Sequence, residues 1–404
     1  MTQKKPILKD DARIGIANRG EAAIRFIRAV RDFNRLHGTR LRTAAFHLDR
    51  ERDSLFAQEA DSAHPLSGFP SFATGTGSPY LNRTLMREAL AAADCSAVWV
   101  GWGFLSEDAE FVAAVEEAGL VFLGPSSRAM ALLGDKIAAK ELAERSSVPI
   151  CPWSRGPVQD LDAARGVAEK IGYPVIVKAS NAGGGRGIRF VPRPEDLPGA
   201  FTSAVEETYR ITGNRVVFIE RLVEKGRHLE VQVLADRHGN VRTFGVRDCS
   251  VQRKNQKIVE ETPPADFDPS LMRSMEESAA RLIRSAGYEG AGTVEFLYDL
   301  ARREFYFMEV NTRLQVEHPI TEQLYGVDLV GGQILVARNG SIADWVLEPR
   351  GAVVEVRLNA EDPNKDFRPA PGKVVRFKPP AGPGIRVDSG IEGGSEIPPE
   401  FDSM

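Results

Sequence analysis

The most informative segment of the sequence is Met308-Glu-Val-Asn-Thr-Arg-Leu-Gln-Val-Glu-His-Pro319. It overlaps the apolar run Phe305–Val310, which follows Thr293–Asp299 across a short loop, and the two runs together predict an antiparallel hairpin. Glu295 and Glu309 stand nearly symmetrically about that loop, so they can lie opposite each other on neighbouring strands. Two like charges in such positions destabilise a sheet unless something neutralises them.

A divalent cation would neutralise this pair of carboxylates. Mg²⁺ takes oxygen ligands and often completes its shell with phosphate, and Asn311 offers a further neutral oxygen. The alternative is a pair of solvated strand carboxylates. Both glutamates have apolar neighbours, which favours the metal site; these neighbours are Val294, Phe296, Met308 and Val310.

The nine residues from Asn311 to Pro319 concentrate polar groups directly after the second strand of the hairpin. They include two amides, a guanidinium, a carboxylate and an imidazole. A guanidinium and an amide can hold a small planar anion, and a nearby carboxylate can take its proton. So many polar groups would be costly to bury without partners, so the stretch indicates a site rather than a structural loop.

A glycine loop, Lys178-Ala-Ser-Asn-Ala-Gly-Gly-Gly-Arg-Gly187, lies between the expected strands Tyr173–Ala179 and Gly187–Val191. Glycines let backbone N–H groups approach phosphates without interference from Cβ atoms, and Lys178 would add a positive charge. The alternative is a flexible hairpin with an edge lysine, and the loop alone does not decide between them. The chain contains no Walker A or GxGxxG pattern, which removes the main support for P-loop and dinucleotide folds.

The first 130 residues or so alternate short apolar runs with helical patterns, which predicts a parallel sheet covered on both faces. Strands are expected at Arg13–Ala17, Thr43–Leu48, Ser96–Gly101 and Leu120–Gly124, and helices at Glu21–Phe33, Tyr80–Ala93 and Ser106–Ala118. A stretch rich in Pro, Ser and Gly, Pro149–Gly156, predicts a linker. From His228 the pattern becomes antiparallel β, with polar and apolar residues alternating.

Composition excludes several classes of protein. The 404 residues predict two or three domains. The formal net charge of −4 comes without any Lys/Arg block, so no nucleic-acid surface is expected. The apolar runs are too short to span a membrane, and the N-terminus lacks the apolar core of a signal peptide. Three cysteines without CxxC spacing fit a reducing compartment, so we expect a cytoplasmic protein.

The chain resembles the biotin carboxylase component of biotin-dependent carboxylases, which are ATP-grasp enzymes. The segments that carry the resemblance occur in that family's order over nearly the whole chain, and NTRLQVEHP is the most specific of them. They are NRGE (18–21), GFLSE (103–107), GDK (134–136), VKAS…GGGRG (177–187), HLEVQVL (228–234), RDCSVQR…QK (247–257), GAGTVEF (290–296), MEVNTRLQVEHP (308–319) and RLNAEDP (357–363).

The resemblance implies a role for each matching residue. For ATP phosphates it implies Lys136, Lys178, Gly183, Gly184 and Gly185, and for the nucleoside Glu220, His228, Gln252 and Leu297. For Mg²⁺ or Mn²⁺ it implies Glu295, Glu309 and Asn311. For bicarbonate it implies Lys257, Arg313, Gln315 and Val316. Glu317 would deprotonate bicarbonate and Arg357 would stabilise the enolate of biotin.

The resemblance also implies an α/β architecture of three domains. They are a parallel α/β domain at 1–134, an ATP-grasp lid at 135–222, and a mixed antiparallel C-terminal domain at 223–404 that we expect to be incomplete, because in similar carboxylases it continues past the position of Met404. The chain contains no AMKM-like biotinylation site. A biotin carrier domain and a carboxyltransferase are therefore expected as partners, in the same chain or in other subunits, together with a homo-oligomeric state. The final carboxyl acceptor is not encoded here.

Three other interpretations compete with this one. Another ATP-grasp ligase, such as a carbamoyl-phosphate synthetase, would share the lysines and the paired glutamates but should lack the NTRLQVEHP run. A nicotinamide-dependent dehydrogenase is suggested only by the first β–α–β unit. An inactive nucleotide-binding subunit would have lost acid–base or metal residues, and none is lost. Cys249 is better explained as a small buried residue than as a catalyst.

Overall fold

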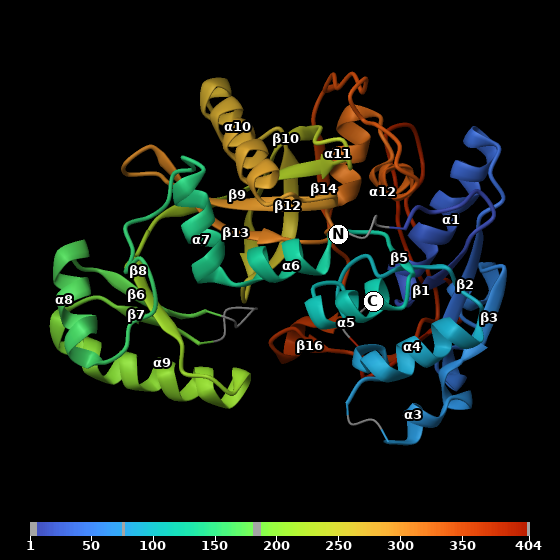
Figure 1. Cartoon of the computed structure of the whole chain (residues 1–404), viewed down its shortest axis with the longest axis horizontal. Helices are drawn as coiled ribbons and strands as arrows, with labels where there is room; N and C mark the ends of the chain where they lie inside the picture. Colours follow the sequence, from blue (N-terminus) through green and yellow to red (C-terminus); the bar gives the residue numbers. More distant parts are fainter. Residues whose placement is uncertain (1–5, 75–76, 181–186, 402–404) are drawn as a thin grey trace.

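The computed structural model describes residues 6–74, 77–180 and 187–401. Its first part is a parallel sheet in the order β3-β2-β1-β4-β5, with helices on both faces (Figure 1). The strands are β1 (Arg13–Ile16), β2 (Arg42–His47), β3 (Ser62–Pro65), β4 (Ala97–Trp99) and β5 (Val121–Phe122). The parallel sheet is confirmed, but the edge strand β3 was missed, because its four residues carry no apolar run.

The helices of this part follow the apolar stripes of the sequence. They are α1 (Gly20–His37), α2 (Leu55–Glu59), α3 (Pro70–Thr74), α4 (Arg83–Ala92) and α5 (Ala109–Glu117), with short 3₁₀ turns at Asp49–Glu51, Leu66–Gly68 and Pro79–Leu81. Helices α6 (Ser127–Gly134) and α7 (Lys136–Arg145) follow, and their buried side chains join the core of the large antiparallel sheet instead. In α1 the predicted stripe is buried, and Phe26 stacks on Trp99 of β4 at 4.5 Å. The helix ends at Gly38, whose φ of 65° suits glycine.

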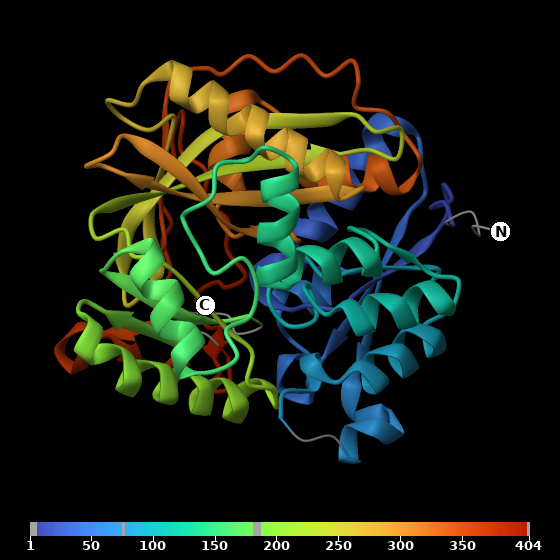
Figure 2. The ribbon, with the colours of Figure 1, turned by 60° about the vertical axis from the view of Figure 1, so that its left-hand side comes forward.

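A smaller unit stands to the left in Figure 1 and comes forward in Figure 2. Its antiparallel sheet has the order β7-β6-β8. The elements are α8 (Leu161–Ile171), β6 (Val175–Ala179), β7 (Ile188–Val191), a 3₁₀ turn at Pro194–Asp196, α9 (Leu197–Thr212) and β8 (Val217–Arg221). Its buried side chains form a core of their own. The unit contains the two strands expected on either side of the glycine loop, as β6 and β7.

The largest sheet has the order β13-β12-β9-β10-β11-β14, and every neighbouring pair is antiparallel. Its strands are β9 (Gly226–Ala235), β10 (Val241–Arg253), β11 (Gln256–Thr262), β12 (Gly290–Asp299), β13 (Glu304–Asn311) and β14 (Val353–Val356). The helix α10 (Pro269–Ser285) packs on the face that carries Leu229, Val231 and Val233. The opposite face of β9 therefore presents the polar residues that the alternation predicted.

Helices α11 (His318–Tyr325) and α12 (Leu329–Ala337) follow the hairpin β12–β13 and connect the large sheet to the core of the first part. The chain ends in two short strand pairs and a 3₁₀ turn: β15 (Glu361–Asp362) with β16 (Arg368–Pro369), β17 (Gly372–Lys373) with β18 (Glu396–Ile397), and Pro363–Lys365. Among the residues described, no helix combines the length and the apolar character needed to cross a membrane.

Candidate functional site

A wide cavity of about 1650 Å³ opens beside β11 and β14, under the loop that joins β13 to α11. It gathers the predicted anion-binding and acid–base residues from segments far apart in the sequence. Those that line it are Lys257, Glu295, Asn311, Arg313, Gln315, Val316, Glu317 and Arg357. Of the predicted phosphate and nucleoside residues, those that the structure describes do not line this cavity.

Lys257 is the centre of the charged groups in the cavity. Its Nζ lies 2.6 Å from an oxygen of Glu230, 2.6 Å from Glu317 and 3.1 Å from Glu295. Burial alone would lower the pKa of Lys257, but the three carboxylates outweigh it and raise that pKa well above its ordinary value. One ammonium group thus holds three carboxylates together and stays charged.

Glu317 lies between two cations. Its second oxygen accepts a hydrogen bond of 3.0 Å from Arg357, while its first binds Lys257. Burial and the neighbouring Glu230 would raise the pKa of Glu317, but Lys257, Arg357 and the buried Arg247 lower it below its ordinary value. The carboxylate is therefore ionised at neutral pH and able to accept a proton.

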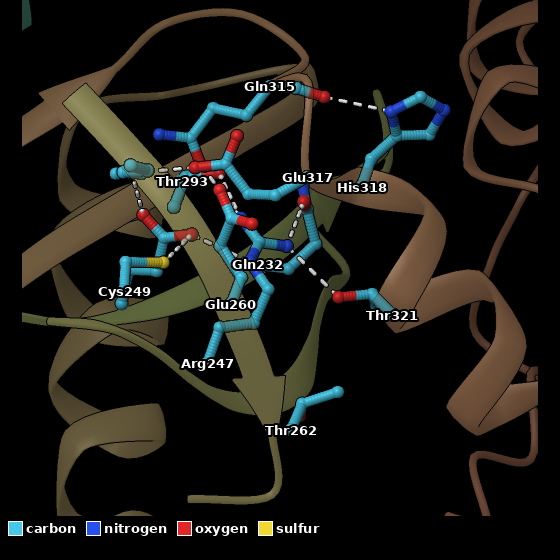
Figure 3. Close-up of polar contacts among 12 residues, drawn as sticks. Gln232, Arg247, Cys249, Glu260, Thr262, Thr293, Gln315, Glu317, His318 and Thr321 are labelled. Carbon is cyan, nitrogen blue, oxygen red and sulfur yellow. Dashed lines mark hydrogen bonds and ion pairs between the residues drawn. The ribbon is translucent and has the colours of Figure 1, made fainter. Parts of the chain in front are cut away.

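A buried guanidinium supports this arrangement from below (Figure 3). Arg247 on β10 is inaccessible to solvent and donates to Glu230 at 2.6 Å and to Gln315 at 2.7 Å. Its other acceptors are Gln232, Thr321 and Thr293. Neither Arg247 nor Glu230 was singled out from the sequence. The available signal was the position of Glu230 on the predicted polar face, and a charged residue within the strand at Arg247.

The hairpin places Glu295 directly opposite Glu309, as the sequence predicted. Their side chains nevertheless have different partners. Glu295 binds Lys257, lies 3.0 Å from Nε2 of His228 and accepts a 2.8 Å hydrogen bond from Asn311. Glu309 is partly exposed and binds Nζ of Lys136 at 2.6 Å. Each carboxylate thus has a cationic partner of its own.

The hairpin carboxylates have the chemistry that Mg²⁺ requires, because hard cations prefer carboxylate and amide oxygens. Asn311 turns its Nδ2 to Glu295, and its Oδ1 accepts from Arg313 at 3.1 Å. Among the described residues, the groups of His, Cys, Asp and Glu with mutually close ligand atoms are His228–Glu230–Glu295 and Glu230–Cys249–Glu317, and neither includes Glu309. A cation at Glu309 would therefore take the place that the Lys136 ammonium holds.

On the smaller unit, Glu220 of β8 receives two lysines. Lys178 of β6 binds one carboxylate oxygen, and Lys140 of α7 lies 2.7 Å from the other. Burial would raise the pKa of Glu220, but the two ammonium groups lower it to about 2. Lys140 was missed in the sequence, where it looks like an ordinary helix lysine. The predicted phosphate-binding residues Gly183, Gly184 and Gly185 lie outside the described residues.

The remaining nucleoside residues gather near one end of β9. Leu297 pairs with His228 across β12 and β9, and Nε2 of Gln252 lies 2.9 Å from Nδ1 of His228. Burial would lower the pKa of His228, but Glu295 outweighs burial and raises it. His228, Gln252 and Leu297 therefore lie together, and the contact between His228 and Glu295 links them to the hairpin.

Two further carboxylates hold the predicted anion-binding arginines. Arg313 binds Glu107, from the loop after β4, at 3.0 Å, and Arg357 binds Glu260 at 2.7 Å. Burial raises the pKa of Glu260 to about 6 against the opposing effect of Arg357.

Burial also raises the pKa of the Cys249 thiol, whose Sγ donates to Glu230 at 3.2 Å. This supports the interpretation of Cys249 as a buried residue rather than a catalyst.

Comparison with known proteins finds matches over nearly the whole chain. Family models match for the biotin carboxylase N-terminal domain (residues 11–130), the ATP-binding domain of the carbamoyl-phosphate synthase L chain (135–344) and the biotin carboxylase C-terminal domain (355–404). Biotin carboxylase 1 of Bacillus subtilis is 41% identical over 96% of this chain and 84% of its own length. The alpha3 subunit of a biotin-dependent acyl-coenzyme A carboxylase from Mycobacterium leprae is 41% identical over 97% of this chain and 64% of its own length.

Solved structures agree with these matches. The biotin carboxylase of Campylobacter jejuni, in a β,γ-ATP complex, superposes with a TM-score of 0.90 at 38% identity, over 97% of this chain and 85% of that one. The biotin carboxylase domain of the 2-oxoglutarate carboxylase of Hydrogenobacter thermophilus was solved with MgADP, ADP and bicarbonate. It superposes with a TM-score of 0.88 at 36% identity, over 99% of this chain and 85% of that one.

Proposed function

Because this chain belongs to the biotin carboxylase family, we propose that its clusters of charged residues divide the steps of one reaction between them. The enzyme is an ATP-dependent carbon–nitrogen ligase that carboxylates biotin with bicarbonate. The cavity around Lys257 takes bicarbonate and biotin, and the lysine–glutamate pairs outside it take ATP and Mg²⁺.

On the ATP side, Lys136 and Lys178 are partly exposed, whereas Glu220 is buried between Lys178 and Lys140. Lys136 and Lys178, with the loop that carries Gly183 to Gly185, bind the phosphates, and Glu220, His228, Gln252 and Leu297 surround the nucleoside. Glu295, Glu309 and Asn311 would hold Mg²⁺ or Mn²⁺, which neutralises phosphate charge when bound. Residues 135–222 act as a lid that excludes water from the reacting groups.

The cavity side prepares the nucleophile. Lys257, Arg313, Gln315 and Val316 hold bicarbonate, and Glu317 accepts its proton. A bicarbonate oxygen then attacks the γ-phosphorus of ATP, the bond to ADP breaks, and carboxyphosphate forms. Such a transfer relies on positioning and on stabilisation of charge. Inside the site the bond between the carboxyl carbon and the phosphate oxygen of carboxyphosphate breaks, which gives CO₂ and phosphate. The phosphate released, or a nearby group, takes the proton from N1′ of biotin, and Arg357 stabilises the resulting enolate. N1′ then attacks CO₂, and the new N–C bond gives carboxybiotin.

The biotin reaches this site on a carrier. Relatives include subunits of acyl-coenzyme A and pyruvate carboxylases, so the partners are a biotin carboxyl carrier domain and a carboxyltransferase that selects the final acceptor. The protein works in the cytoplasm as a homo-oligomer.

The observation that carries the proposal is Glu317, held ionised between Lys257 and Arg357. The test is ATP hydrolysis with and without bicarbonate and free biotin. We expect hydrolysis to require bicarbonate and to increase with biotin. Hydrolysis that is indifferent to both would contradict the proposed division of the site and would favour another ATP-grasp activity.

A further inference from the structure

Two lysines bind the same buried carboxylate, but they differ in their surroundings. Lys140 and Lys178 bind different oxygens of Glu220. The side chain of Lys140 is 3% exposed, whereas that of Lys178 is 20% exposed. Lys178 is also the penultimate residue of β6, close to the glycine loop, whereas Lys140 lies within α7.

The surroundings of Lys140 hold its ammonium in place. Its Nζ lies 5.7 Å from the ring centre of Trp153 and 5.9 Å from that of Phe218. A cation over an aromatic ring is stabilised most strongly where water is excluded. The backbone of Trp153 also bridges to that of Glu220, which keeps the two residues adjacent. Burial, the two rings and the carboxylate together hold the ammonium of Lys140 beside Glu220.

Glu220 needs at least one of these cations. Its side chain is buried, and an unpaired charge in such a position is strongly destabilising. A phosphate group that attracts Lys178 must draw it away from Glu220. If Lys178 were the only partner, ATP would have to leave a buried carboxylate uncompensated. With Lys140 in place, the carboxylate keeps a partner when Lys178 leaves.

We propose that Lys140 is a positioning residue that keeps Glu220 compensated, so that Lys178 is free to move from Glu220 to the phosphates of ATP. This inference rests on the proposed nucleotide site. It gives the two lysines different tasks. Lys140 is the permanent partner of the carboxylate and never touches the substrate, whereas Lys178 is the exchangeable partner.

A double-mutant cycle tests this division. MgADP and a non-hydrolysable ATP analogue are titrated into the wild type, Lys140→Met, Glu220→Gln and the double variant. We expect Lys140→Met to weaken binding of the ATP analogue about tenfold, which is within the usual coupling of residues in one ion-pair network. In the Glu220→Gln background the same substitution should have almost no effect, because no carboxylate remains to retain Lys178. Equal weakening in both backgrounds would mean that Lys140 acts only through packing, and would overturn the proposal.

Stability without nucleotide provides a second measurement. Lys140→Met removes the permanent partner and should lower the unfolding midpoint, whereas Lys178→Met leaves Glu220 paired and should lower it much less. A Lys140→Met chain that does not fold, beside a folded Lys178→Met chain, supports the same asymmetry. Equal losses, or a larger loss in Lys178→Met, contradict it.

Failure of the nucleotide site itself would look different. In that case Lys178→Met and Glu220→Gln would leave the affinity for MgADP and for the ATP analogue unchanged. If both of these variants weaken binding but the cycle shows no coupling to Lys140, the nucleotide site stands and the role of Lys140 is wrong.

Discussion

The charged groups around Lys257 and those at Glu309 differ in how many partners each cation holds. Lys257 binds three carboxylates, and Arg247 beneath it, fully buried, donates to five side chains. Lys136, by contrast, forms one ion pair among the described residues, with Glu309, and the two side chains are 22% and 36% exposed. The first group is a fixed network, and the second is a single pair close to solvent.

This difference suggests how each region works. A cation with several buried partners cannot be displaced without breaking all of its contacts, so the network keeps Glu317 and Gln315 in position before any substrate arrives. A partly exposed pair is weak, because water and salt compete with it. Phosphate can replace Glu309 as the partner of Lys136, and a divalent cation can replace Lys136 as the partner of Glu309. On the proposed assignment of the sites, we therefore expect the cavity to be preorganised and the ATP side to exchange its ion pairs on binding.

The largest effect is expected at the proposed base. Glu317→Gln removes the proton acceptor but keeps the shape of the side chain. We expect biotin-dependent turnover to fall about 10²- to 10⁴-fold, the usual value of a positioned general base, with little change in ATP affinity. Steady-state kinetics and nucleotide titration on the same preparation measure both. Equal losses in turnover and ATP binding would instead assign Glu317 a structural or metal-binding role.

The contrast between network and pair can be tested by stability. Arg247→Met leaves Glu230 buried without its main partner and should lower the free energy of unfolding by about 3–5 kcal/mol. Lys136→Met breaks a partly exposed pair and should cost about 1 kcal/mol or less. Denaturant unfolding of the two variants without ligand gives both values. Similar costs would show that the buried network is no more fixed than the exposed pair.

The sequence predicted the pairs better than the network. The register of β12 and β13 followed from alternation and a short loop, because a shift of one residue would turn every side chain to the other face. Glu295 and Glu309 were therefore placed opposite each other correctly. The segments of the family resemblance likewise placed His228, Gln252 and Leu297 together.

The contacts of the buried Arg247 could not be predicted from the sequence in the same way. The partners of Arg247 come from β9, β12, α11 and the loop before it, so only tertiary packing brings them together. Lys136 begins α7 and Lys140 lies within it, and both look like solvated lysines until the fold sets Glu309 and Glu220 beside them. The edge strand β3 was missed for a local reason, since four residues ending in proline carry no strand pattern.

The next test addresses Glu309, the carboxylate of the partly exposed Lys136–Glu309 pair. Glu309→Gln removes a charged oxygen ligand, so the Mg²⁺ concentration needed for half-maximal activity should rise about 10- to 100-fold. Weakened support of a metal ligand alone has effects of that size. Saturating Mg²⁺ should recover much of the lost rate. Glu317→Gln is the matched control, because its residual activity should keep the wild-type Mg²⁺ dependence. Identical Mg²⁺ titrations of the two variants would refute the division of labour between these glutamates.

The smallest effect concerns the pH dependence of stability on the cavity side. The pKa of Glu260 is raised from 4.5 to about 6 by burial, despite the nearby Arg357. The folded protein therefore binds this proton more tightly than the unfolded chain does, so its contribution to stability is complete below about pH 4.5 and is lost as the pH rises through 6. A shift of this size corresponds to about 2 kcal/mol.

Glu260→Gln should remove that loss. Between pH 4.5 and 6 the wild type should lose stability relative to this variant, as measured by denaturant unfolding at each pH. Glu220→Gln is the control from the other region. The pKa of Glu220 is lowered to about 2 by its two lysines, so its contribution is present above 4.5 and is lost only as the pH falls through 2. The control should therefore keep the wild-type slope across the same range. Two outcomes would contradict this prediction. The stability difference between the wild type and Glu260→Gln could stay constant with pH, or both variants could change the pH dependence of stability equally. Either would mean that burial does not hold Glu260 protonated beside the ionised Glu317.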